Sequence, residues 1–201
     1  MFALVESGSI TKMLNGNKGI QIGDLKYPRA IYTLWTEAER NAIGIYTVEY
    51  DDSNKKDGKW YINTDQSFAF ANNKVTASYG SATAKAHADT TWTAQDETDG
   101  KGTEGEIAIR GLKYNLIKQI KSSANSELAK TDWYITRKAE KNTAIPSAIT
   151  THRDAVRSKQ AAMETAITNA SDTPALETLY TYTEDSDGVN SRPLGVLPTL
   201  E

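Results

Sequence analysis

The stretch TDWYITRKAEKNTAIP, residues 131–146, decides how the C-terminal half of the chain folds. Thr131 or Asp132 can begin a helix there, because a side-chain oxygen at that position accepts a hydrogen bond from a free backbone N–H of the first turn. Pro146 suits the first turn of the helix that follows. The stretch therefore predicts a short helix that forms a corner between two longer helices.

Trp133 stands directly after this helix start, and its role has two interpretations. In the first, the indole fills the seam between the two helices, and the stretch is only a corner. In the second, Trp133, Tyr134 and Arg137 form an exposed patch, because Trp, Tyr and Arg are the residue types that dominate protein-binding surfaces. The sequence by itself leaves both interpretations open.

Helical patterns lie on both sides of the corner, within a predicted helical domain of residues 105–183. Apolar residues recur there at three- and four-residue steps, as on one face of a helix. Asp172 and Pro174 predict a further helix start. Residues 184–201 are predicted to be an extended tail, with apolar side chains that suit contact with another surface. The two apolar stripes comprise Ile109, Leu112, Leu116, Ile120, Ala124 and Leu128, and then Ile149, Val156, Met163 and Ile167.

Residues 1–80 are predicted to be mainly strands. A turn at residues 6–8 and a pair of asparagines at 72–73 each indicate a hairpin. Thr36 and Glu39 have the spacing of a helix-capping box. Residues 81–104 are poor in aliphatic side chains and are predicted to be a linker. The expected fold is α+β: a small antiparallel N-terminal sheet with one helix, a linker, then a C-terminal helical hairpin or bundle.

The composition excludes several classes of function. The net charge is −3, and no concentrated basic face of the kind that binds nucleic acid is visible. Cysteine is absent, which excludes disulfides and thiolate chemistry. No stretch approaches the roughly 18 apolar residues of a membrane span, and the start lacks the pattern of a secretory signal. The sequence thus predicts a soluble protein with no nucleic-acid and no membrane partner.

No catalytic, metal or cofactor site is predicted. The two histidines, His87 and His152, have no second histidine at helical spacing, whereas metal sites need several converging ligands. His152 is expected to be a surface or half-buried helical residue. The acidic groups at 51–57 and 184–187 lack the ligand spacing of a calcium loop. We therefore expect a protein that is not an enzyme.

The segment LAKTDWYITRKAEKNTAIPSAITTHRDAVR, residues 128–157, resembles the C-terminal module of bacteriophage tail and tail-fibre assembly proteins. The shared pattern is a helix ending in Leu128, the triplet Thr131–Trp133, a charged helix, Pro146, and a helix with paired arginines. Those arginines are Arg153 and Arg157. The stretches FALVESGSIT and LWTEAERNAIGIYTV are also similar to the front halves of such proteins.

The resemblance implies a non-enzymatic protein that contacts a phage tail or tail-fibre protein. The first hypothesis is an assembly factor of chaperone type, which would work in the host cytoplasm. The alternative is a resident structural component of the virion, an adaptor in the tail, baseplate or fibre. A second copy of the chain, in a homo-oligomer, is a further partner that the sequence leaves open. The residues expected to bind the partner are Trp133, Tyr134, Arg137, Arg153 and Arg157.

Overall fold

A computed structural model describes residues 1–200 of the chain. It divides into two compact units, one of residues Met1–Thr83 and one that begins at Ala84. The division falls close to the predicted end of the N-terminal domain at residue 80. Both strands and helices are present, so the α+β class is confirmed in this broad sense.

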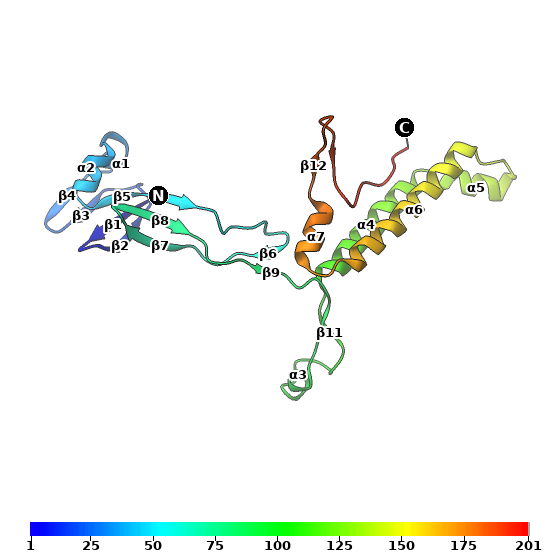
Figure 1. Cartoon of the computed structure of the whole chain (residues 1–201), viewed down its shortest axis with the longest axis horizontal. Helices are drawn as coiled ribbons and strands as arrows, with labels where there is room; N and C mark the ends of the chain where they lie inside the picture. The colour runs from blue at the N-terminus through cyan, green and yellow to red at the C-terminus, as the bar shows by residue number, and fades with distance from the viewer. Residues whose placement is uncertain (201) are drawn as a thin grey trace. The chain divides into compact units, whose positions relative to one another are not determined.

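The first unit is built on a five-stranded sheet (Figure 1). The predicted hairpin turn at Ser7–Gly8 joins the first two strands, and the predicted hairpin at Asn72–Asn73 joins the last two. Both asparagines have the left-handed backbone that such a turn requires, with φ of 51° and 58°. In spatial order the strands are β2 (Ser9–Leu14), β1 (Phe2–Glu6), β5 (Ile45–Asp51), β8 (Lys74–Ser78) and β7 (Ser67–Ala71).

The prediction of a purely antiparallel sheet is wrong, because β5 and β8 pair in parallel. The reason lies in which strand of the second hairpin is more apolar in its buried positions. Val75 and Ala77 of β8 are fully buried, whereas most of β7 is exposed. The hairpin therefore joins the sheet through β8. The long connection after β5, which holds the short strand β6 (Tyr61–Ile62), leads to β7, which runs opposite to β5. The turn at Asn72–Asn73 then reverses the chain, so that β8 runs in the direction of β5.

The sheet carries apolar clusters on both faces, because successive side chains of a strand point to opposite sides. In β1, Phe2 and Leu4 belong to one cluster, and Ala3 and Val5 belong to the other. The sheet curls so that β2 and β7, at its two edges, contact each other. The second cluster also contains Val48, Val75 and Ala77, with Ile10, Met13, Tyr46 and Phe70 against it.

A hairpin, formed by β3 (Ile20–Ile22) and β4 (Leu25–Tyr27), and the short helix α1 (Ile31–Leu34) contribute to the first cluster. The helix α2 (Glu37–Ala42) has no buried residue, and Trp35 and Ile43, on either side of it, pack against the cluster instead. The prediction of a single helix differs from the structure, because Trp35 adopts an extended backbone between α1 and α2. Thr36 then begins α2 with the predicted capping box, in which Glu39 N–H donates to the Thr36 hydroxyl and Thr36 N–H donates to the Glu39 carboxylate.

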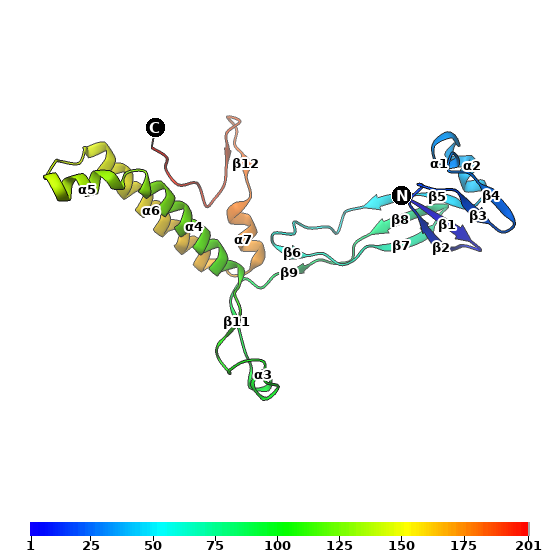
Figure 2. The same cartoon turned by 180° about the vertical axis from the view of Figure 1, so that it is seen from behind.

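The second unit contains a helical hairpin, which is formed by α4 (Leu112–Ala129) and α6 (Ser147–Asn169). The helix α5 (Asp132–Lys141) lies between them in the chain, and α7 (Thr173–Tyr180) follows α6. The helices α4 and α6 lie side by side, and α5 lies where the chain turns between them (Figure 2). Ala124 and Val156 are fully buried in this layer. Leu116 and Ile120 follow the predicted stripe, but Ile109 lies outside the helix on an exposed strand.

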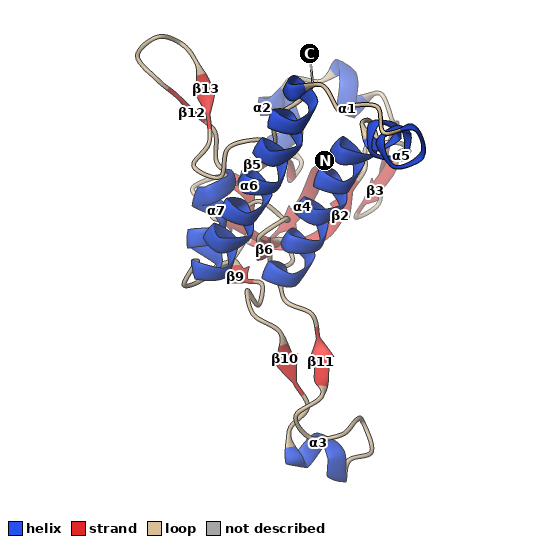
Figure 3. Cartoon of the chain, turned by 90° about the vertical axis from the view of Figure 1, so that its right-hand side faces the viewer, coloured by secondary structure: helices blue, strands red, loops and turns tan. Residues whose placement is uncertain are grey.

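Residues 81–104, predicted to be a linker, contain ordered elements (Figure 3). After β9 (Thr83–Ala84), strands β10 (Thr90–Thr91) and β11 (Ile107–Ile109) pair and carry the short helix α3 (Ala94–Thr98) between them. We call residues 90–109 the arm. Its base is fixed to α4, because Leu112 N–H donates to the Ala86 carbonyl and Lys113 N–H donates to the His87 carbonyl, at 3.0 Å each. These bonds satisfy amides that the first turn of a helix leaves free.

The predicted extended tail of residues 184–201 also differs in its first part, because β12 (Thr183–Glu184) and β13 (Asn190–Ser191) form a small hairpin. We call residues 192–200 the strap. Its Leu194 is 2% exposed, and the Leu194 N–H donates to the Leu179 carbonyl at 3.0 Å. The apolar tail thus packs, at Leu194, on the chain's own body. Glu201 lies outside the described residues.

Gly44 is the position in the first unit where a side chain is least tolerated. Its φ is +81°, and an added Cβ would lie 2.6 Å from the carbonyl oxygen of Val5. We expect Gly44→Ala to lower the free energy of unfolding by about 1–3 kcal/mol, since backbone strain and a close contact with backbone act together.

Thermal unfolding followed by circular dichroism measures this effect. Gly8→Ala is the matched control, because Gly8 also has a positive φ (+78°) but has open space around its Cβ position. Equal losses for the two variants would show that the contact with Val5 contributes nothing.

Candidate partner-binding site

The corner between α4 and α6 is held by the side chain of Arg153. One terminal nitrogen of its guanidinium donates to the Leu128 carbonyl at 2.8 Å, to the Thr131 hydroxyl at 2.7 Å and to the Asp132 carboxylate at 2.8 Å. Arg153 is 8% exposed and Thr131 is fully buried. We call these four residues the clasp. It joins the end of α4, the start of α5 and the first half of α6.

The clasp changes the expected roles of two residues. Arg153 was predicted to bind a partner, but its burial and its three internal acceptors make it a structural residue. Thr131 occupies the predicted cap position of α5, yet its hydroxyl makes no hydrogen bond to the first turn of that helix. The hydroxyl instead donates to the Leu128 carbonyl at 3.0 Å and accepts from Arg153. Pro146 directly precedes α6 rather than lying in its first turn.

Beyond the clasp, α5 presents an exposed aromatic surface. The rings of Trp133 and Tyr134 lie with their centroids 3.8 Å apart and at 34° to each other. Trp133 is 52% exposed, so it does not fill the seam between the helices, and the first interpretation of this residue is wrong. Ile135 adds a further apolar side chain that is 43% exposed. We call Trp133, Tyr134, Ile135 and Arg137 the α5 surface.

Arg137 is the charged member of the α5 surface. Its guanidinium carbon lies 4.6 Å from the Trp133 ring centre and 5.2 Å from that of Tyr134. Stacking of a guanidinium on an aromatic ring stabilises the folded chain by about 0.5–1 kcal/mol at an exposed site, and it restricts the motion of the arginine side chain. Among the described residues, the Arg137 Nε has no hydrogen-bond partner although it is shielded from solvent. The Nε of Arg153 is in the same state, so a carboxylate ligand of Arg137 would pair with its terminal nitrogens.

Arg157 lies apart from the α5 surface. It is exposed, and its guanidinium is 3.4 Å from the carboxylate of Asp154. It lines a groove between α4 and α6, together with Asn125, Leu128, Gln160, Ala161, Glu164, Thr165, Thr168 and Asn169. Of the five residues predicted to bind a partner, the structure therefore groups only Trp133, Tyr134 and Arg137.

A buried carboxylate, which the sequence analysis missed, ties the strap to the helical hairpin. Glu127 is 7% exposed, pairs with Lys130, and accepts a hydrogen bond from the Leu200 N–H at 3.1 Å. His152 is buried rather than half-buried, and its Nε2 lies 3.3 Å from a Glu127 oxygen. No local pattern indicates this site, because Glu127 and Leu200 are distant in the chain.

Within residues 1–200, no group of three or more histidine, cysteine, aspartate or glutamate side chains is arranged to hold a metal ion. Among the same residues, no helix combines the length and the apolar character that crossing a membrane requires. Comparisons of the chain with protein families, with curated proteins and with solved structures gave no match. The phage resemblance of residues 128–157 thus remains a hypothesis carried by the sequence pattern.

The clasp predicts unequal effects at the two paired arginines. We expect Arg153→Ala to lower the free energy of unfolding by about 2–3 kcal/mol, because it leaves the Leu128 carbonyl and the Thr131 hydroxyl without their charged donor. Arg157→Ala should change it by no more than about 0.5 kcal/mol, since Arg157 is exposed. Urea denaturation of both variants tests this difference, and similar losses for the two would contradict the clasp.

The Glu127 site predicts a pH-dependent attachment of the strap. The pKa of Glu127 is lowered from 4.5, first by the hydrogen bond from Lys130 and then by the Leu200 N–H and the charge of His152. A lowered folded-state pKa means that the stabilisation is complete above the unfolded value and is lost as the pH falls through the folded value. We therefore expect the strap to loosen only in acid, below pH 4.5.

The chemical shift of the Leu200 amide in nitrogen–proton NMR spectra measures this titration. Glu127→Gln, which removes the titrating carboxylate, should abolish the pH dependence. A midpoint at or above 4.5 in the unaltered chain would contradict the assignment.

Proposed function

We propose that this protein is a non-enzymatic bacteriophage tail protein, an assembly factor that binds a tail or tail-fibre polypeptide through the α5 surface. The observation that carries the proposal is the exposed Trp133 with Arg137 stacked on it. An exposed indole beside a restrained guanidinium combines the two residue types most enriched where binding energy concentrates. The phage context comes from the resemblance of residues 128–157.

Within residues 128–157, the geometry separates residues that bond inside the chain from residues that face outward. Thr131, Asp132 and Arg153 are used inside the chain, in the clasp. Trp133 and Arg137 follow directly on α5 and are held in place by the clasp without contributing to it. A rigid frame lowers the entropic cost of binding, because fewer side chains must be ordered when the partner arrives. A binding role therefore explains the outward-facing residues, which the clasp leaves unexplained.

A second candidate is a resident structural component of the virion, such as an adaptor in the tail, baseplate or fibre. The arm favours this alternative, because it is an ordered projection from the second unit and suits contact with a neighbouring subunit. An assembly factor would act in the host cytoplasm and be missing from finished particles. Mass spectrometry of washed virions separates the two, since a stoichiometric amount of the chain would support the resident component and contradict the assembly factor.

Substitutions on the α5 surface test the binding role. We expect Trp133→Ala and Arg137→Ala each to weaken capture of the tail or fibre polypeptide about tenfold or more, because residues of this kind typically contribute about 2 kcal/mol to binding. Surface plasmon resonance with the co-expressed partner measures the change.

The melting temperature should stay near that of the unaltered chain, because Trp133 is half exposed and lies outside the clasp. Leu34→Ala is the matched control, since Leu34 is an exposed apolar residue of the first unit. Unchanged capture together with a lowered melting temperature would assign Trp133 to the fold and not to a binding site.

A further inference from the structure

Opposite ends of the second unit carry opposite charge. Residues 94–106, at the tip of the arm, include five acidic side chains and one basic side chain. Residues 130–141, which contain α5, include four basic and two acidic side chains. One of those acids, Asp132, is bonded to Arg153 in the clasp, and one of those bases, Lys130, is paired with Glu127. The tip of the arm is therefore strongly acidic, and the region around the α5 surface is basic.

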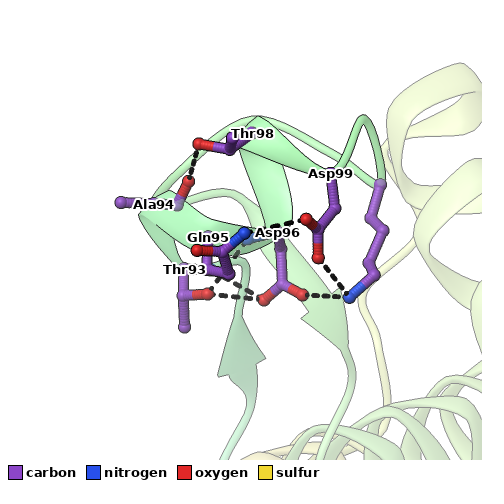
Figure 4. Close-up of polar contacts among 7 residues, drawn as sticks. Thr93, Ala94, Gln95, Asp96, Thr98 and Asp99 are labelled. Carbon is purple, nitrogen blue, oxygen red and sulfur yellow. Dashed lines mark hydrogen bonds and ion pairs between the residues drawn. The ribbon is translucent and has the colours of Figure 1, made fainter.

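The arm tip is an ordered structure that holds its charges in fixed positions (Figure 4). Thr93 begins α3 with a capping box, in which the Asp96 N–H donates to the Thr93 hydroxyl and the Asp96 carboxylate accepts from Thr93. Lys101 reaches back to the carboxylates of Asp96 and Asp99 at 3.0 and 3.1 Å. The Thr93 hydroxyl, with Lys101, lowers the pKa of Asp96 to about 2. Asp96 thus stays charged over the physiological range.

A second feature restricts the arm tip. Gly102 lies against the indole of Trp92, because an added Cβ would be only 2.2 Å from the Trp92 Nε1. Trp92 is also held by its backbone, which bonds to Glu106 at 2.9 Å and to Gly105 at 3.0 Å. A restrained surface loses little conformational entropy on docking.

Not all carboxylates of the arm tip are used inside it. Asp96 and Asp99 are paired with Lys101, whereas Glu104 and Glu106 are exposed. At the other end of the unit, Arg137 has a shielded Nε that lacks an acceptor among the described residues. That nitrogen is closed to an outside carboxylate, which would pair instead with the terminal nitrogens of the guanidinium.

The two surfaces cannot meet within one copy. The arm joins the second unit at the start of α4, and α5 follows the end of α4 (Figure 3). A helix of 18 residues is about 27 Å long, at 1.5 Å per residue. This rigid helix keeps the acidic tip and the α5 surface apart, so their charges can be matched only between copies.

We propose that the acidic arm tip of one copy docks on the α5 surface of a second copy. Arg137 receives a glutamate carboxylate there, while Lys138 and Lys141 add long-range attraction and Trp133 and Ile135 lose contact with water. The contact is head to tail, so it leaves one free surface at each end and builds rings or chains of copies. This inference goes beyond the proposed function, and on the shared α5 surface a second copy competes with a tail or fibre polypeptide.

Charge reversal tests the contact in the purified full-length chain. The α5 variant carries Lys138→Glu and Lys141→Glu. The arm variant carries Glu97→Lys, Glu104→Lys and Glu106→Lys, which turns five acidic side chains and one basic side chain at the tip into two acidic and four basic. The unaltered chain is expected to associate with rising concentration in sedimentation velocity experiments. Each variant should weaken this association at least about tenfold, because like charges then face each other. High salt should weaken the unaltered contact too, since at about 1 M salt screening acts within about 3 Å.

Mixing the two variants is the decisive measurement. Each contact in the mixture joins surfaces of opposite charge, so association should return to near the unaltered level. Asp24→Lys with Lys26→Glu, on the exposed β3–β4 hairpin of the first unit, is the matched control and should leave association unchanged.

The absence of cysteine allows a direct test of which surfaces meet. Ala139 on α5 and Thr103 on the arm are both exposed. A mixture of the single variants Ala139→Cys and Thr103→Cys, treated with a thiol oxidant that takes up the two electrons, should form disulfide-linked heterodimers. A chain that stays monomeric at all concentrations would overturn the proposal. Association that survives both charge reversals would do the same. Because no partner is added, either result would leave the effect of Trp133→Ala on fibre capture, and with it the proposed function, untouched.

Discussion

The second unit depends on one interaction, the binding of the Arg153 guanidinium to three oxygens at the corner. Leu128, Thr131 and Asp132 supply these oxygens from the end of α4 and the start of α5, and Arg153 supplies the charge from α6. A carbonyl left free at a buried helix end is costly, and a charged donor is a strong way to satisfy it. The same contact fixes the direction in which α5 leaves the hairpin. The orientation of the α5 surface is therefore a consequence of the clasp.

Polar contacts stabilise both ends of the second unit: backbone hydrogen bonds at one end and side-chain contacts of Glu127 at the other. At the start of α4, backbone carbonyls of Ala86 and His87 satisfy the first amides of the helix and fix the base of the arm. At its far end, the buried Glu127 pairs with the exposed Lys130, accepts a hydrogen bond from the Leu200 amide and lies 3.3 Å from His152. Polar bonds thus position the arm, the strap and α5 around a thin apolar layer. A layer of two helices has little core of its own, which explains why these polar contacts carry so much of the geometry.

The first unit follows a different principle, because its sheet has apolar side chains on both faces. Alternation along β1 supplies both clusters, and the second depends on β8 entering the sheet beside β5. The helix α1 and the β3–β4 hairpin then complete the cluster on the other face. Both of the proposed contact surfaces, the α5 surface and the arm tip, lie on the second unit, on elements held by polar contacts.

Local patterns in the sequence determined much of this protein by themselves. The turns at Ser7–Gly8 and Asn72–Asn73, the capping box of Thr36 and Glu39, and the stripes of α4 and α6 all depend on neighbouring residues, so their physics is visible in a short window. The capping box at Thr93 and Asp96 has the same spacing and could have revealed α3 within the supposed linker. Only the tertiary structure decided that Arg153 is internal, that Trp133 is exposed, that β5 and β8 are parallel, and that Glu127 meets Leu200. Each of these outcomes depends on which distant segment supplies the partner for a polar group or covers an apolar one, and spacing along the chain carries no information about that choice.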